Sequence, residues 1–133
     1  MFPSAFIHRQ CKTVGYCFMK SGAMGIDSDD FGRKMMNSDY GIMVLTDKRM
    51  IEYSDKMFMY EGIEKNLQFK RGKSYEPDIL YYVGYLYKYW ISTRGENPKK
   101  IWKIAPLKLI ATRYEFYHTQ GFDYVINDLI SRH

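Results

Sequence analysis

The strongest structural signal in the sequence is a long run of aliphatic and aromatic residues at positions 79–91, which lies between helix-start and helix-stop residues. Pro77 fits the first position of a helix, where its missing N–H group is no loss, and Asp78 beside it is favoured by the helix dipole. Arg94-Gly95-Glu96 ends the pattern. Residues 77–94 therefore predict one long helix, and any fold of this chain has to bury its apolar side.

Two stripes of different chemistry run along this predicted helix. An apolar stripe recurs at helical spacing on one side: Ile79, Val83, Leu86 and Trp90. A second stripe with the same spacing carries hydroxyl groups and one ammonium group: Tyr81, Tyr85, Lys88 and Ser92. Tyrosine hydroxyls need partners when buried, and Tyr and Trp are frequent in contact hot spots, so a partner-binding face is one interpretation. A central core helix whose tyrosines reach the surface is the other.

Helical spacing and capping residues predict helices over most of the remaining chain. Their expected ranges are 4–20, 28 to about 37, 55 to about 67, 99–104, 107 to about 116, and a terminal helix after Gly121. Residues 42–45 cannot be assigned, because four apolar residues fit a strand or a buried helical turn equally well. The expected fold is all-α, a compact single-domain bundle of six to seven short helices spanning residues 1–133.

Composition supports an ordinary globular domain. The 133 residues are 46% hydrophobic and 26% charged, without an apolar run that approaches the ~20 residues needed to span a bilayer. The first residues lack the pattern of a secretory signal, so a cytoplasmic location is expected. Cys11 and Cys17 would point about 120° apart on one helix, so they neither pair nor form a metal clip there, and we interpret them as buried hydrophobic residues.

Positive charge is concentrated in the middle of the chain. The formal net charge is +5, but residues 65–113 carry 11 Lys and Arg against 3 Asp and Glu. Such a segment indicates an anionic partner, either nucleic acid or an acidic protein surface, or else a solvated face that serves solubility. Lys99, Lys100 and Lys103 are the candidate contact residues, although Lys108 and Arg113 point too far apart for a DNA-reading helix.

Few residues suggest catalysis. His8, His118 and His133 are scattered, and no metal-ligand spacing, glycine-rich phosphate loop or nucleophile elbow occurs, so neither a metal nor a cofactor is expected. Arg113 followed by His118 resembles the motif of the all-α HEPN ribonucleases, with His as acid or base and Arg as phosphate ligand. Tyr114 departs from that motif, which usually has a polar residue after the Arg. A corner histidine bonded to the backbone of its own turn is the alternative.

The C-terminal segment from Tyr114 to Ile130 carries a second resemblance. An aromatic residue, then His118-Thr119-Gln120-Gly121, then Tyr124-Val125 and Asp128 before two aliphatic residues form the shared pattern. This pattern is similar to the C-terminal segment of small bacterial proteins encoded beside ADP-ribosyltransferase-like toxins in toxin–antitoxin cassettes. The resemblance covers about an eighth of the chain, and the aromatic, basic residues 75–102 have no counterpart in it. The four-residue corner is interpreted as structural, with Gly121 supplying backbone freedom and Thr119 able to cap.

Taken together, the resemblance and the residues favour a module that works by binding. The expected function is a protein-binding component of a toxin–antitoxin or phage-related system, which binds a partner protein, such as a toxin, and occludes it. The expected contact residues are Tyr81, Tyr85, Lys88, Trp90, Lys99, Lys100 and Lys103. A HEPN-like ribonuclease that uses Arg113 and His118 and a nucleic-acid-binding accessory protein are the alternatives.

Overall fold

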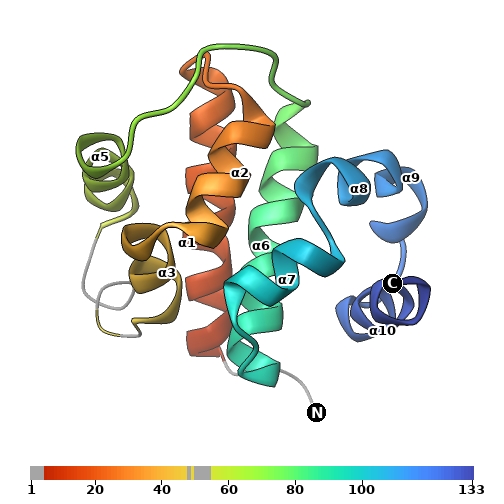
Figure 1. Ribbon diagram of the computed structural model, residues 1–133. Coiled ribbons are helices and arrows are strands. Elements are labelled where there is room, and N and C mark those ends of the chain that lie inside the picture. Colours follow the sequence, from red (N-terminus) through yellow and green to blue (C-terminus); the bar gives the residue numbers. More distant parts are fainter. Residues whose placement is uncertain (1–4, 48, 50–54) are drawn as a thin grey trace.

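The computed structural model describes residues 5–47, 49 and 55–133, which form an all-α domain (Figure 1). Among these residues there are nine helices and no strand. The helices are α1 (Ala5–Ala23), α2 (Ser28–Asn37), α3 (Asp39–Thr46), α5 (Lys56–Asn66), α6 (Pro77–Arg94), α7 (Pro98–Ile104), α8 (Leu107–Thr112), α9 (Tyr114–Tyr117) and α10 (Phe122–Arg132). The all-α class is confirmed, and seven of these helices have seven residues or more.

Helices α1 and α6 lie side by side at the centre of the domain and run in opposite directions (Figure 1). Their close approach depends on a pair of glycines. A Cβ atom added at Gly84 would lie 2.8 Å from the carbonyl oxygen of Val14, and one added at Gly15 would lie 2.9 Å from the carbonyl oxygen of Tyr81. Because helix backbones can approach this closely only where side chains are absent, the two glycines fix the separation of the central pair.

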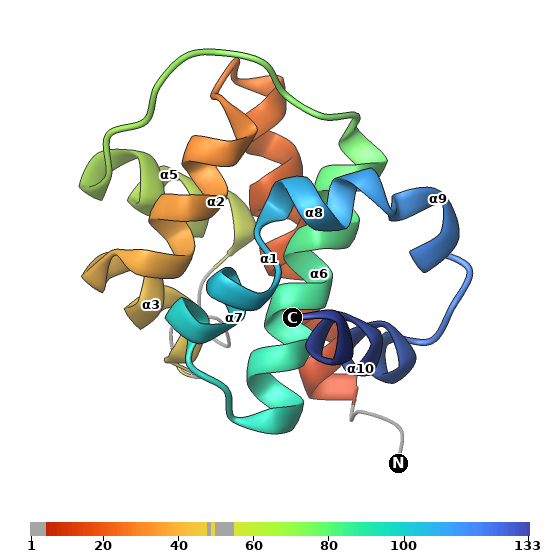
Figure 2. The ribbon, with the colours of Figure 1, turned by 45° about the vertical axis from the view of Figure 1, so that its right-hand side comes forward.

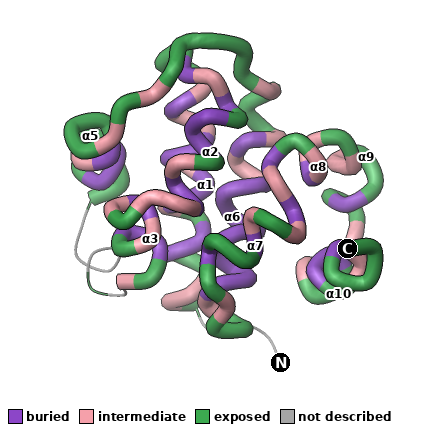
Figure 3. The backbone as a smooth tube through the Cα atoms, viewed as in Figure 1, coloured by how far each residue is buried: buried purple, intermediate pink, exposed green. Residues whose placement is uncertain are grey.

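The remaining helices surround this pair. Helices α2, α3 and α5 lie on one side and α8, α9 and α10 on the other, while α7 packs against α2 and α6 (Figure 2). Every residue from Val83 to Ile91 is consequently buried (Figure 3). The interpretation of 77–94 as a core helix is therefore correct for its middle turns.

Local sequence signals set most helix boundaries. Pro77 is the first residue of α6, and Gly95 ends that helix with a φ of 63°, in the left-handed region that glycine adopts most easily. The Asn97 side chain accepts a hydrogen bond of 2.8 Å from the Lys99 N–H and so caps α7. The Asp27 carboxylate accepts the Asp30 N–H at 2.9 Å and caps α2, which begins at Ser28 as expected.

Two further boundaries extend or correct the sequence prediction. Residues 42–45 belong to α3, which the Ser38 side chain caps. The helix expected from 107 to 116 is interrupted at Arg113, whose φ of −101° and ψ of 9° separate α8 from α9. None of the helices described is long and apolar enough to cross a membrane.

The segment between α5 and α6 crosses one end of the domain and is held against the start of α2 (Figure 1). The buried Asp30 carboxylate accepts a 2.8 Å hydrogen bond from the Lys70 N–H and pairs with Arg33 and Lys34. Burial alone would raise the pKa of Asp30. The hydrogen bond from Lys70 and the contacts with Lys34 and Arg33 outweigh that effect and hold the pKa below its usual value. Backbone bonds add to this side-chain contact: the Asp27 and Ser28 N–H groups donate to the carbonyl oxygens of Lys70 and Lys73 at 2.8 and 3.0 Å, and Ile26 forms an isolated antiparallel bridge with Arg71.

Candidate binding cleft

A cleft of about 480 Å³ opens where α1, α6, α9 and α10 meet, and we call it the aromatic cleft. Four tyrosines, one phenylalanine, two histidines and one acid line it: His8, Asp78, Tyr81, Tyr82, Tyr85, Tyr114, His118 and Phe122. Its size and its mainly aromatic walls with a few polar groups are typical of ligand-binding pockets. It brings together residues from both ends of the chain.

The aromatic rings of the cleft pack against one another. Phe122 stacks on Tyr85 with ring centroids 4.9 Å apart and planes 16° apart, and on Tyr82 at 5.7 Å and 26°. Tyr114 meets Tyr82 edge to face at 5.5 Å and stacks on His118 at 4.7 Å. Since each ring is held by at least one other, the walls are pre-formed and do not have to be ordered by a ligand.

Two of the four tyrosine hydroxyl groups are already engaged. The Tyr82 hydroxyl donates to the carbonyl oxygen of Tyr117 at 3.2 Å, and the Tyr85 hydroxyl bonds to Nδ1 of His8. Within the part of the chain that the structure describes, the Tyr81 and Tyr114 hydroxyls have no hydrogen-bond partner. The cleft therefore offers two unused phenol groups to a ligand.

Burial and nearby negative charge keep these hydroxyls protonated. Desolvation, followed by the neighbouring Cys11 and Tyr81, raises the pKa of Tyr85 to about 12. The pKa of Tyr114 is also raised, first by desolvation and then by the negative charges of Asp78 and Glu115. At neutral pH the tyrosines of the cleft are thus neutral hydrogen-bonding groups.

The sequence-predicted contact residues on α6 divide into two groups. Tyr81 is half-buried and lines the aromatic cleft, as does Tyr85, which is 8% exposed. Lys88 and Trp90 are only 2% and 1% exposed, so their expected place on a partner-binding face is wrong. Nζ of Lys88 donates to the carbonyl oxygen of Leu45 at 2.6 Å, which satisfies a buried ammonium group inside the core.

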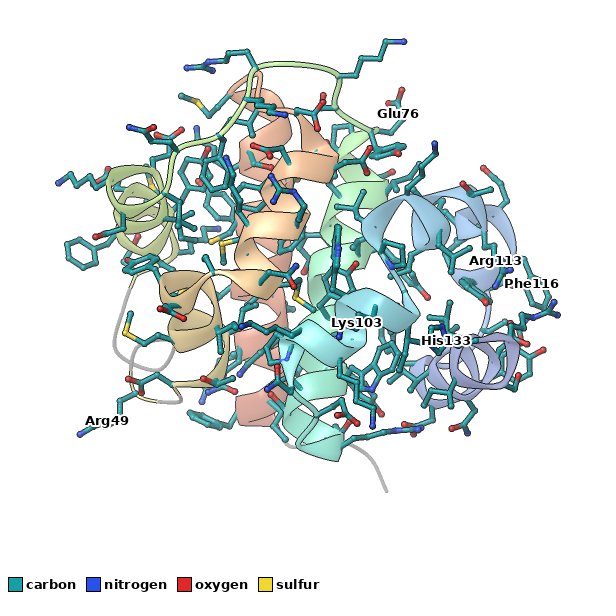
Figure 4. The ribbon with its side chains drawn as sticks, viewed as in Figure 1. Arg49, Glu76, Lys103, Arg113, Phe116 and His133 are labelled. Carbon is teal, nitrogen blue, oxygen red and sulfur yellow. The ribbon has the colours of Figure 1, made fainter. Side chains whose placement is uncertain are left out.

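The three predicted lysines of α7 do not join the cleft. Lys99, Lys100 and Lys103 are exposed, and Lys103 lies on the front of the view in Figure 4. Helix α7 reaches α6 through Tyr87, whose hydroxyl donates to the carbonyl oxygen of Ala105 at 2.7 Å. Tyr87 is two residues, or about 160° of helix, away from Tyr85. The lysines and the aromatic cleft therefore occupy different sides of α6.

The expected basic segment is likewise divided in space. Lys70, Arg71 and Lys73 lie in the connection across one end of the domain, whereas the lysines of α7 lie toward its other end (Figure 1). Lys88 is buried and contributes nothing to the surface. A single positive track of the kind that follows a nucleic-acid backbone is not formed by these residues.

Arg113 and His118 also serve different parts of the structure. Nη1 of Arg113 donates to the Tyr117 hydroxyl at 3.1 Å, and that hydroxyl donates to Asp128 at 2.6 Å, which ties α9 to α10. His118 instead lines the cleft, and its Nδ1 bonds to the carbonyl oxygen of Tyr114 at 2.8 Å. The ring thus bonds to backbone, as the alternative interpretation of a corner histidine predicts, but the acceptor lies in α9 rather than in the turn of residues 118–121.

The rest of the corner differs in detail from expectation. The Thr119 hydroxyl donates to the carbonyl oxygen of Phe116 at 2.7 Å and does not cap α10. Gly121 has a φ of −68°, and a Cβ atom there would meet nothing within 4 Å, so this turn does not require glycine. Phe122, the first residue of α10 after this corner, stacks on Tyr82 and Tyr85.

The metal-ligating and thiol groups that the structure describes form no metal site and no reactive thiol. Among the residues described, no three His, Cys, Asp or Glu side chains are placed to hold a metal ion. Cys11 and Cys17 are 0% and 1% exposed, as expected for buried hydrophobic residues, and burial raises the pKa of each thiol to about 12. Both cysteines are therefore inert packing groups.

Sequence reasoning missed most of the aromatic cleft, although one signal was present. Asp78, Tyr81, Tyr82 and Tyr85 are spaced i, i+3, i+4 and i+7 and share one stripe of α6. No comparable pattern links that stripe to the side chains that complete the cleft from α1, α9 and α10.

No protein-family model, no curated protein and no solved structure matches this chain.

Proposed function

We propose that this chain is a protein-binding module and that the aromatic cleft is its contact site. One observation carries the proposal: four tyrosines converge in an open, pre-formed cleft, two of them with unused hydroxyl groups. Tyrosine supplies a large contact area at little cost in side-chain entropy, which explains its frequency in binding surfaces. The cleft thus has the composition of a hot spot.

The narrower role rests on the resemblance of the C-terminal segment. His118 and Phe122, at the corner and at the start of α10, both line the aromatic cleft. The proposed role is a component of a toxin–antitoxin or phage-related module, in which filling the cleft occludes a surface of the partner. The ribonuclease alternative gains no support from the geometry, since Arg113 is not among the residues that line the cleft with His118.

Site-specific photo-crosslinking tests the contact site. A benzophenone amino acid replaces Tyr81, and in a control chain it replaces Phe58, an aromatic residue of α5 that is 67% exposed. In the native host, the Tyr81 position should capture one protein that the Phe58 position does not. Equal capture from both positions would show that the contact does not involve the aromatic cleft.

A reconstituted titration then measures the contribution of the cleft. With the captured protein purified, Tyr81→Ala should weaken binding by about 2 kcal/mol, which is roughly 30-fold, if Tyr81 is a hot spot. The control is Lys99→Ala, because Lys99 lies in α7, away from the cleft; this variant should keep the affinity within twofold.

A growth assay tests the narrower role: the captured protein alone should arrest the host, and co-expression of this chain should relieve the arrest. Continued arrest would reject the antitoxin role while leaving the binding result intact.

A further inference from the structure

The polar atoms of the aromatic cleft are predominantly hydrogen-bond acceptors. Asp78 is exposed and forms no ion pair or hydrogen bond with the residues that the structure describes. Nδ1 of His118 bonds to the carbonyl oxygen of Tyr114, which can only accept, so Nδ1 carries the proton. In the neutral imidazole, Nε2 of His118 is then an acceptor as well. A matching ligand has to bring hydrogen-bond donors.

The charge of the cleft favours a cation. Among the described residues that line it, none is Lys or Arg, whereas Asp78 is one of them. Asp78 and Glu115 are close enough to Tyr114 that, after desolvation, their negative charges contribute to its raised pKa. The faces of tyrosine and phenylalanine rings attract cations through their quadrupole, most strongly where water is excluded. The ring faces and the Asp78 carboxylate therefore both attract a positively charged ligand.

A guanidinium group meets these requirements better than an ammonium group. It is planar, presents five N–H donors without an acceptor, stacks on aromatic faces and pairs with a carboxylate through two parallel bonds. The Asp78 carboxylate and the unused hydroxyls of Tyr81 and Tyr114 are its potential partners. The cleft volume of about 480 Å³ is ample for one such side chain. An ammonium group is a compact, strongly hydrated charge and would make less contact with the flat faces of the tyrosine rings.

Building on the protein-binding role proposed above, we propose that the aromatic cleft receives an arginine side chain of the partner. The guanidinium group lies against the tyrosine rings and pairs with Asp78. The partner surface is thus basic at the point of contact, with an arginine as its anchor. This assignment also explains why the exposed lysines of α7 lie away from the cleft, since they would repel such a surface.

The probe for this site is Nα-acetyl-arginine N-methylamide, titrated into the full chain while the aromatic ring signals are followed by NMR. The citrulline analogue is the matched probe, because it has nearly the same shape but no charge. We expect saturable shifts of the Tyr81, Tyr114 and Phe122 ring signals in the millimolar range with the arginine probe. The citrulline probe should bind at least tenfold more weakly.

Matched carboxylate variants locate the charge. Asp78→Asn should reduce the affinity for the arginine probe at least fivefold. Asp39→Asn is the control, because Asp39 is likewise an exposed acid in the first turn of a helix but lies on α3, away from the cleft. Both variants lose a comparable interaction with a helix dipole, so their stabilities should be similar. Any difference in probe binding then reports on the cleft itself.

The outcomes separate this inference from the proposed function. Equal binding of the two probes, no saturable shift at the cleft, or equal effects of the two Asp→Asn variants would overturn the arginine assignment. If partner capture from Tyr81 nevertheless succeeds, protein binding stands and the anchor is not a cation. If the arginine probe binds as expected but no partner is captured from Tyr81, the cation site stands and the protein-binding role fails.

Discussion

The glycine contact between α1 and α6 makes a sharp prediction about stability. In Gly84→Ala, the new methyl group would lie 2.8 Å from the carbonyl oxygen of Val14, 3.0 Å from Cα of Gly15 and 2.8 Å from a ring atom of Phe18. Two of these three atoms belong to the backbone of α1, so a rotamer change of one side chain cannot relieve the contact. The two central helices have to move apart.

Two opposing terms set the magnitude of this effect. Replacing Gly by Ala inside a helix stabilises it by about 1 kcal/mol. Overpacking a core typically destabilises a protein by about 1–3 kcal/mol, and contacts with backbone atoms belong at the upper end of that range. Gly84→Ala should therefore lower the free energy of unfolding by about 1–2 kcal/mol, which for a domain of this size lowers the thermal midpoint by several degrees.

Gly62→Ala in α5 provides the matched control. Among the residues that the structure describes, the added Cβ there would meet one atom, the hydroxyl oxygen of Tyr40 at 2.8 Å, which is the far end of a flexible side chain. This variant should be as stable as the original chain or up to about 1 kcal/mol more stable. Urea unfolding followed by circular dichroism measures both variants. A Gly84→Ala protein at least as stable as the original would refute the idea that the glycine pair sets the helix separation.

Four further outcomes can be checked. Leu129→Ala should destabilise the fold by about 2–5 kcal/mol, since Leu129 is 1% exposed, and an unchanged thermal midpoint would show that α10 contributes little. Cys11 and Cys17 should react with a thiol reagent at pH 8 only at the rate of unfolding, because burial raises the pKa of both to about 12. Stability should fall as pH rises from about 9 toward 12, because these thiols and Tyr85 lose their protons in the unfolded chain first; a constant unfolding midpoint in urea across that range would contradict this. Any RNA cleavage by the purified chain should survive His118→Ala, and its loss in a variant with an intact circular dichroism spectrum would instead favour the ribonuclease alternative.

Local signals in the sequence were sufficient for much of the fold. Pro77 and Gly95 delimit α6 because each has a backbone preference that needs no tertiary context. The apolar residues of α10 recur at helical spacing, and Val125, Ile126 and Leu129 among them are buried, whereas Ile130 of the same stripe is 44% exposed. Where one side of a helix faces solvent and the other faces the core, the spacing of its apolar residues identifies most of its buried side chains.

The same reasoning failed for α6 because no side of its middle turns, residues 83–91, faces solvent. A two-faced pattern assumes that polar atoms point to water, but the Lys88 ammonium and the Tyr87 hydroxyl reach backbone carbonyl oxygens of other elements instead. Those acceptors are set by the packing of α3 and α7. No spacing rule within α6 contains that information, so the pattern placed Lys88 on the polar side although it is buried, while Trp90 of the apolar stripe is buried as that stripe predicts.

The aromatic cleft lies beyond sequence reasoning for a related reason. His8 and Phe122 are more than 100 positions apart, and they meet only because α1 and α10 both pack beside α6. Their contribution to one site depends on tertiary packing rather than on any local pattern.

The same separation has a consequence for the order of events during protein synthesis. Phe122 is synthesised more than 100 residues after His8, so the cleft has no fourth wall until α10 has been made. At about 5–20 residues per second, this interval is roughly 5–20 s. During that time the stacking positions of Tyr82 and Tyr85 that Phe122 later occupies are open to chaperones or to other chains. A partner that recognises the complete cleft can therefore bind only after α10 has been synthesised, and a ribosome-bound fragment that lacks α10 would not compete for it.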